Sequence, residues 1–307
     1  MNNNSYMFGR IAKLRFETEK TETKEASIFQ LTNKDIDFDC SIDLDNTNNS
    51  NKATINIYNL PQTEKILLVK NTKVTIEAGY EDEGAHGTVF YGIIEKFKDS
   101  RDNDGIRTEI QCTIANDEMK ENKIQLSFGK GAKASTIISS IISKTRLQKG
   151  EIKLGKDIAY ERGKTFNNHI KNIFSRLATD TQSRFYISNS IVFFYPVGEA
   201  KKDEIQCIVE MVNDVSETDE GFTIKTFFDH RVEEGTFYNI DYKDESLRQE
   251  IKGKFEVIKV RHAINTRNGS HDTEIEIKTK IKEEEKKVKV KVNGVKKEKS
   301  KSKKGSK

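Results

Sequence analysis

ATINIYNLPQ, residues 53–62, opens the stretch of sequence that decides the fold. It is followed by VTIEAGY (74–80), VFYGIIEKF (89–97), DSRDNDG (99–105) and RTEIQCTIAND (107–117). Four of these five segments alternate apolar with polar residues, which is typical of antiparallel strands that bury one face. The polar segment 99–105 consists of turn-forming residues and is predicted to join two of the strands as a hairpin. The stretch therefore predicts an antiparallel β-structure.

The alternation extends toward the N-terminus, where a polar loop is expected between two further strands. Pro61 favours the first turn of a short helix that includes Ile66, Leu67 and Val69. The sequence thus predicts a six-stranded β-module with one helical insertion over residues 1–119. Its strands are expected at 12–16, 36–44, 53–58, 73–80, 89–97 and 106–115.

The middle of the chain, residues 120–203, changes from strand to helix periodicity. Two groups of apolar residues are spaced as one face of an amphipathic helix, and Thr165 is a suitable N-cap for the second. Ser188-Asn189-Ser190 then separates two short apolar runs, as in a β-hairpin. We expect a small α+β insert here. The two helical faces are Ala134, Ile137, Ile138, Ile141 and Ile142, and then Phe166, Ile170, Ile173, Phe174 and Leu177.

Strand alternation returns over residues 204–281, which predicts a second β-module. Its strands are expected at 205–211, 222–228, 230–240, 253–265 and 271–278. The fold class predicted for the whole chain is mainly β (β+α): two antiparallel β-barrel modules flank the α+β insert, and a basic C-terminal tail follows.

Charge is unevenly distributed in the chain. Hydrophobic residues make up 34% and charged residues 33% of the sequence, so the core is lean and the surface heavily charged. Residues 282–307 contain 12 lysines and 4 glutamates, a net charge of +8, and the remainder carries 41 basic and 45 acidic residues, a net charge of −4. A solvated, flexible tail is expected. The alternatives are a hairpin around Asn293-Gly294 on a partner and contacts with nucleic acid.

The three cysteines fall on the apolar phase of predicted strands, where a thiol behaves as a small hydrophobe. Their odd number argues against a disulfide framework. They are Cys40, Cys112 and Cys207.

Three histidines and two aspartates near the C-terminal end are candidate ligands for a metal ion, but their spacing does not support a site. They lack tight ligand spacing, so we expect histidines at loops and strand ends on the surface, with neither metal nor cofactor bound. The set is His230, His262, His271, Asp229 and Asp272.

Other motifs that could carry chemistry fail on inspection. The loop before Gly105 has Ser100 and Gln111 where an EF-hand needs carboxylates, so a hairpin turn is expected instead of a calcium site. Gly129-Lys130-Gly131 lacks the spacing of a phosphate-binding loop and is read as the start of a helix. No catalytic motif is present, and we expect a protein that is not an enzyme.

The order of these segments resembles a known family. A strand ending in Tyr58-Asn59-Leu60, a short helix, a strand ending in Gly79-Tyr80 and a strand with Phe90 and Gly92 is similar to the first barrel of phage baseplate hub proteins. Gly253 before a strand that runs into His262 resembles the second barrel. The resemblance covers about residues 8–281 and identifies a hub of contractile-tailed phages or phage-tail-like bacteriocins.

This resemblance implies a structural role. In the family, three copies form a ring, and each copy has two barrels similar to the tail-tube subunit, so that a six-fold tube is joined to a three-fold spike. The implied partners are further copies of the chain, the tube protein, the central spike and other baseplate proteins, with the tape measure as a further candidate.

Three alternatives stay open: a cell-wall hydrolase associated with the tail, a hub of a long, non-contractile tail, and a nucleic-acid-binding module. The first ten residues lack the apolar core of a secretory signal. The apolar run near 191–197 is far shorter than the ~20 residues that span a bilayer. We therefore expect assembly in the bacterial cytoplasm, a location in the particle, and no membrane partner.

Overall fold

The structure is a computed structural model of the chain. It describes residues 9–18, 25–45, 51–82, 84–102, 105–114, 123–145, 147–188, 191–197, 199, 204–219, 221–244 and 249–278. The lysine-rich segment 282–307, the predicted turn at Asn189-Ser190 and the predicted boundaries at 119/120 and 281/282 lie outside the described residues. The boundary predicted at 203/204 falls where the described residues resume at Glu204.

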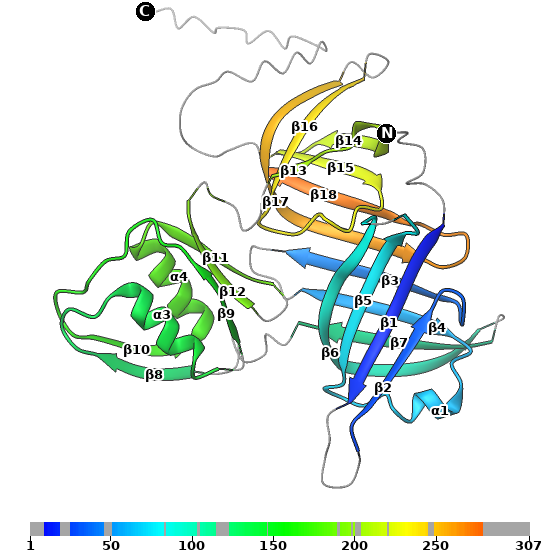
Figure 1. The fold of residues 1–307 in the computed structure, drawn as a ribbon, viewed down its shortest axis with the longest axis horizontal. Coiled ribbons are helices and arrows are strands. Elements are labelled where there is room, and N and C mark those ends of the chain that lie inside the picture. The colour runs from blue at the N-terminus through cyan, green and yellow to red at the C-terminus, as the bar shows by residue number, and fades with distance from the viewer. Residues whose placement is uncertain are drawn as a thin grey trace, which may run out of the picture.

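Among the residues that the structure describes, the first β-module contains seven strands and one short helix (Figure 1). One strand, β2, lies where the sequence indicated a polar loop. Only two of its apolar residues, Phe29 and Leu31, turn toward the core. The helix ends before Ile66, earlier than expected. The elements are β1 (Arg10–Thr18), β2 (Ser27–Thr32), β3 (Phe38–Asp45), β4 (Lys52–Tyr58), α1 (Gln62–Lys65), β5 (Lys73–Tyr80), β6 (His86–Asp102) and β7 (Gly105–Thr113).

The α+β module has its own hydrophobic core. The predicted helical faces are buried and the predicted hairpin forms, but the start of the second helix was wrong. Phe166 lies in a strand, and the helix begins at Ile170 with His169, not Thr165, as its N-cap. The elements are β8 (Lys123–Phe128), α3 (Ala134–Ile142), β9 (Gln148–Ile152), β10 (Lys164–His169), α4 (Ile170–Asp180), β11 (Ser183–Ser188) and β12 (Ile191–Pro196).

The second β-module follows the predicted order with four differences. Strand β14 was not expected, and the strand expected at 230–240 begins only at Phe237. The expected strand 205–211 is interrupted by a 3-10 helix at Val209–Met211, so Cys207 lies between elements. Gly253 lies inside a long strand that begins at Gln249, and does not precede one. The strands are β13 (Ile205–Gln206), β14 (Val212–Glu217), β15 (Gly221–Phe227), β16 (Phe237–Asp244), β17 (Gln249–Asn265) and β18 (Asp272–Lys278).

The two β-modules form one 13-stranded sheet. They meet where β17 of the second module pairs antiparallel with β3 of the first, and one hydrophobic core runs through both. Among the described residues, no strand pairing closes either module into a complete ring. The prediction of a mainly β chain with antiparallel β-modules on both sides of an α+β insert is confirmed.

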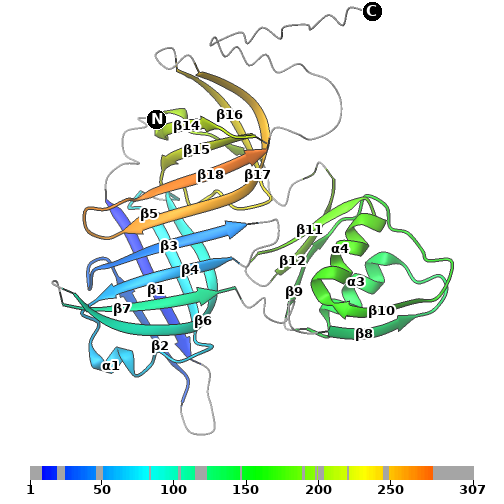
Figure 2. The ribbon, with the colours of Figure 1, turned by 180° about the vertical axis from the view of Figure 1, so that it is seen from behind.

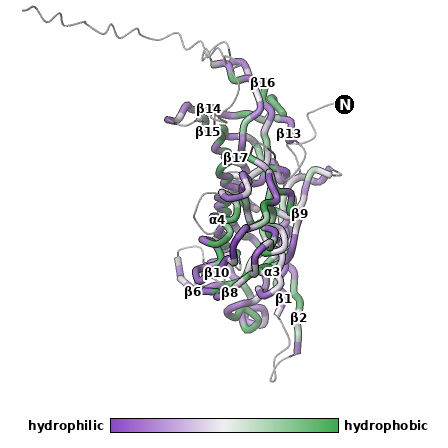
Figure 3. Tube along the Cα trace, turned by 90° about the vertical axis from the view of Figure 1, so that its left-hand side faces the viewer, coloured by the Kyte–Doolittle hydropathy of each residue, from purple (hydrophilic) through white to green (hydrophobic). Residues whose placement is uncertain are grey.

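The α+β module lies beside the β-modules (Figures 1 and 2). Side chains of the two parts are in contact. Arg184 forms an ion pair with Glu256, and its guanidinium lies 5.6 Å from the centre of the Phe237 ring. Seen from the side, the molecule is thin, with strands and the α+β module in one slab (Figure 3). The described helices are too short to cross a lipid bilayer.

Candidate functional site

Tyr58 and Asn59 fix the end of β4 by contacts to β3 and to the start of β7. The Tyr58 hydroxyl donates a hydrogen bond to Asp39 at 2.8 Å. Asn59 adopts a left-handed backbone with φ of 56°, a conformation that asparagine tolerates better than most residues. Its side-chain Oδ1 accepts a hydrogen bond from the backbone N–H of Ile106, and its backbone N–H donates one to the Ile106 carbonyl. These contacts tie β4 to the β6–β7 hairpin.

Leu60, Phe90, Gly92 and Gly253 also lie within the β-modules. Leu60 and Phe90 are buried in the core. A Cβ at Gly92 would lie 2.5 Å from the carbonyl oxygen of Thr113, so the close approach of β6 to β7 needs glycine there. Each of these residues has a packing or backbone task in the described structure.

Gly79 and Tyr80 lie where the first β-module meets the second. The Gly79 carbonyl is 3.3 Å from Nε2 of His271, and the Tyr80 ring meets the His271 ring edge-on at 5.4 Å. Phe228 stacks on the other side of His271, with ring centres 4.5 Å apart. The structure thus brings together residues that are about 190 positions apart in the sequence.

His262 completes this cluster from β17. Its Nδ1 is 3.0 Å from the Thr273 hydroxyl, and its ring centre is 5.2 Å from that of Phe228. We call Tyr80, Phe228, His262, His271 and Thr273 the histidine junction. The expectation of surface histidines was wrong for His262 and His271, both of which are buried. The alternation of Val260, His262 and Ile264 along one strand face was the sequence signal for this burial.

Burial determines the protonation of both histidines. It lowers the pKa of His262 from 6.5 to about 4, because a charged imidazole would lose its hydration. The pKa of His271 also falls to about 4, through burial first and the nearby charge of Arg10 second. Both rings are neutral at pH 7, which suits packing against Phe228.

Polar contacts also join the two β-modules. Arg261 of β17 forms an ion pair with Asp43 of β3 at 2.8 Å. Asn51 donates a buried hydrogen bond of 2.9 Å to Glu234. Together with the main-chain pairing of β17 and β3, these contacts fix the two β-modules relative to each other.

The described residues offer no built site for a metal or a phosphate. They contain no group of three or more histidine, cysteine or acidic side chains that could hold a metal ion. The start of α3 after Gly131 is occupied by Asp157, whose carboxylate accepts hydrogen bonds from the amide and hydroxyl of Ser135. The hairpin predicted around 99–105 forms between β6 and β7, but the turn was predicted too long: residues 99–102 continue β6, and Gly105 begins β7. The three cysteines are buried and unpaired, as predicted.

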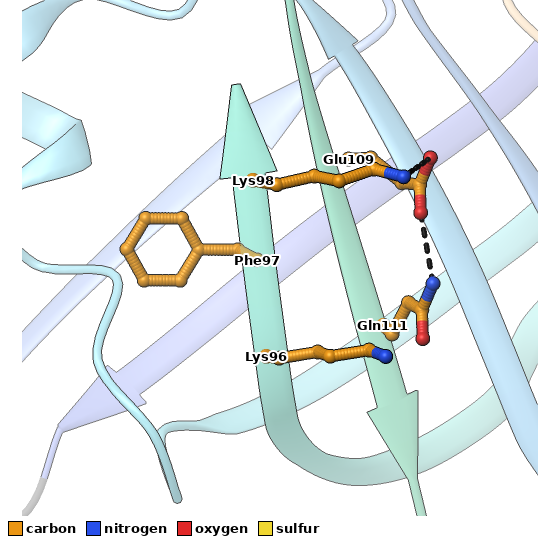
Figure 4. A pocket seen from close by; sticks show the side chains of 5 residues that line it. All are labelled: Lys96, Phe97, Lys98, Glu109 and Gln111. Carbon is orange, nitrogen blue, oxygen red and sulfur yellow. Dashed lines mark hydrogen bonds and ion pairs between the residues drawn. The ribbon is translucent and has the colours of Figure 1, made fainter. Parts of the chain in front are cut away.

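A small pocket lies at the C-terminal half of β6 and the adjoining part of β7 (Figure 4). Lys98 forms an ion pair of 3.3 Å with Glu109, which also accepts a hydrogen bond of 2.8 Å from Gln111. Phe97 extends from the strand on the side opposite to Lys96 and Lys98. Sequence reasoning did not identify this surface.

Solved structures with the same fold come from phage tails and a secretion system. The 43 kDa tail protein of prophage MuSo2 from Shewanella oneidensis is 8% identical, with a TM-score of 0.61 over 87% of this chain and 98% of that one. A tail protein from Neisseria meningitidis is 9% identical, with a TM-score of 0.60 over 88% and 97%.

The fold is that of phage tail proteins. An Escherichia coli component of the type VI secretion system, with structural similarity to the bacteriophage T4 tail proteins gp27 and gp5, is 10% identical, with a TM-score of 0.53 over 78% of this chain and 72% of that one. No model of a known protein family matches the sequence, and no curated protein matches it either. The resemblance inferred from the order of strands is confirmed at the level of the fold.

Proposed function

We propose that this protein is a structural hub of a contractile phage tail or of a phage-tail-like bacteriocin. Three copies form a ring between the six-fold tail tube and the three-fold central spike. The ring also contacts other baseplate proteins. It is assembled in the bacterial cytoplasm and remains in the particle, and it catalyses no reaction.

The observation that supports this proposal most is the pair of β-modules in one chain. They lie edge to edge through β17 and β3, in a fold that matches phage tail proteins over nearly its whole length. Three copies of such a chain present six β-modules. A three-fold assembly can then meet both a six-fold and a three-fold neighbour through heterologous contacts that close on themselves.

Solution mass and particle images test the proposal. Mass photometry of the full chain over a range of concentrations is expected to show a species of three copies. Cryo-electron micrographs of assembled tails are expected to place three copies at the junction of tube and spike. Absence from that junction, or six copies there, contradicts the proposal. Clearing of cell-wall substrate by the purified protein in a zymogram favours the hydrolase instead.

A further inference from the structure

The α+β module is strongly basic, whereas the two β-modules are acidic. Residues 123–197, which include the elements from β8 to β12, have 13 basic and 4 acidic residues, a net charge of +9. Residues 1–122 and 198–281 together have 28 basic and 41 acidic residues, a net charge of −13. The small net charge of the chain before the lysine-rich segment therefore conceals two parts of opposite charge.

Ion pairs within the chain use little of this positive charge. Arg184 pairs with Glu256 of the second β-module, and Lys164 pairs with Asp180 inside the α+β module at 3.4 Å. Lys153 is paired as well. Eight further basic side chains of the module are exposed and form no ion pair among the described residues, so they are accessible to an acidic ligand. They are Lys123, Lys130, Lys133, Lys144, Lys149, Lys156, Arg162 and Arg176.

Five of these eight side chains gather at one end of the α+β module. Backbone hydrogen bonds hold segment 129–134 beside segment 156–162. Arg176 precedes Asp180 by one turn of α4, and the Asp180 carboxylate accepts a hydrogen bond of 2.7 Å from the Tyr160 hydroxyl. The same end of the module therefore includes this part of α4. We call Lys130, Lys133, Lys156, Arg162 and Arg176 the basic end.

Three carboxylates also lie at the basic end, and two of them are engaged within the module. Asp157 accepts two hydrogen bonds from the first turn of α3, and Asp180 is bonded to Tyr160 and paired with Lys164. Glu161 is the third. With Lys164 included, six basic and three acidic side chains leave this end with a net charge of +3.

The chemistry of the module surface suits a chain of phosphates better than a protein. Protein interfaces combine an apolar or aromatic centre with few lysines, and Val197 is the one large apolar side chain that is exposed among the described residues of this module. The phosphates of nucleic acid are bound through lysine and arginine alone. The basic end is an open surface without a pocket for a single phosphate, but it offers several cations to a row of them.

We propose that the basic end of the α+β module binds the phosphate backbone of nucleic acid. Contacts to phosphates position a nucleic acid without reading its sequence, so binding is independent of sequence. The acidic β-modules do not prevent it, because charges farther away than the Debye length of about 8 Å are largely screened at physiological salt. The proposal goes beyond the proposed function and does not depend on it.

Fluorescence anisotropy of a short, labelled DNA duplex tests the proposal with the full chain. Binding is expected at 50 mM salt and is expected to weaken roughly a hundredfold at 200 mM, if about four phosphates are neutralised. A second duplex of unrelated sequence is expected to bind equally well. Absence of binding at the lower salt concentration overturns the proposal.

Charge reversal at the basic end is expected to remove most of this binding. The triple variant Lys130→Glu/Lys133→Glu/Lys156→Glu is expected to lower the affinity at 50 mM salt roughly tenfold or more, and to reduce the salt slope by roughly three. These side chains are exposed, so the variant keeps the packing of the module, and circular dichroism checks its fold.

A matched control separates the position of the charges from their number. Lys123→Glu/Lys144→Glu/Lys149→Glu changes the net charge by the same amount. Strand β8 separates Lys123 from the basic end, and α3 separates Lys144 from it, by roughly 20 Å and 13 Å along these elements. The control is expected to change the affinity less than roughly threefold. An equal loss in both triple variants assigns the binding to overall charge and overturns the basic end.

Lysine acetylation separates the basic end from the lysine-rich segment 282–307 in the same full chain. The protein is treated briefly with an acetylating reagent with and without the duplex, and the modified lysines are identified by mass spectrometry. DNA is expected to protect Lys130, Lys133 and Lys156, and to leave Lys144 and Lys149 reactive. Protection confined to residues 282–307 assigns the binding to that segment and overturns the proposal.

The outcomes distinguish this proposal from the proposed function. Trimers that bind no DNA overturn the nucleic-acid surface and leave the hub proposal untouched. DNA binding by a chain that stays monomeric supports the surface and counts against the hub. If the lysines of the basic end are protected without DNA, and only at concentrations where copies associate, the surface is a contact between copies and the proposal is overturned.

Discussion

Acidification is expected to destabilise the histidine junction selectively. His262 and His271 are buried between the two β-modules, against Phe228. Protonating either ring would place a positive charge in an apolar contact. The perturbation is a shift from pH 7.5 to pH 4.5, compared between the wild-type chain and the variants His262→Gln and His271→Gln.

The magnitude follows from the lowered pKa of each histidine. In the unfolded chain the pKa is about 6.5 and in the folded chain about 4. Between these values the unfolded chain binds more protons, so stability falls as the pH decreases. One pKa unit corresponds to about 1.4 kcal/mol. Each histidine therefore accounts for a loss of about 3 kcal/mol, complete near pH 4, with the full stability present above pH 6.5.

Urea unfolding followed by circular dichroism at several pH values measures this loss. Carboxylates also contribute to acid destabilisation, so the informative quantity is the difference in pH dependence between variant and wild type. Each single variant is expected to lose about 3 kcal/mol less than the wild type over this window.

One result refutes the reasoning. If the double variant His262→Gln/His271→Gln loses as much stability between pH 7.5 and 4.5 as the wild type, the two rings are not held neutral by burial. A loss of stability that is equal at all pH values reports only the change in packing.

Three further predictions concern packing. Gly79→Ala is expected to lower the free energy of unfolding by about 2–3 kcal/mol, because φ is 149° and a Cβ would lie 2.2 Å from the Ala85 carbonyl oxygen. Thermal unfolding measures this, with Gly129→Ala as the control, since a Cβ there meets nothing within 4 Å. Phe174→Ala is expected to lower the free energy of unfolding of the α+β module by about 3–5 kcal/mol. Because the core of this module is separate from that of the β-modules, its amides are expected to exchange with solvent first. Simultaneous exchange in the β-modules would contradict this. The three thiols, whose pKa is raised by burial, are expected to react with a thiol reagent only as the protein unfolds; fast reaction in the native state is the contrary outcome.

The sequence predicted most strands because their alternation is local. The helix start near Thr165 was wrong because Phe166 suits both a strand and a helix face, and pairing with Leu126 of β8 decides for the strand. β2 was missed because two apolar residues, the exposed Ile28 and the half-buried Phe29, are adjacent and so interrupt the alternation of apolar and polar residues. Local patterns do not contain such pairings.

The histidine junction could be predicted only in part. Gly79, Tyr80 and His262 were identified from the order of segments, but their contact with His271 and Phe228 depends on the pairing of β17 with β3. That pairing joins residues more than 200 positions apart.

The antiparallel pairing of β17 with β3 has a mechanical consequence. Seven residues of each strand lie in register, so a force that pulls the two modules in opposite directions along these strands loads all their hydrogen bonds at once. A force across the strands would open them one after another, like a zipper. The fold is therefore stiff against sliding and compliant against peeling, a directional strength that a flexible linker between two separate domains does not provide.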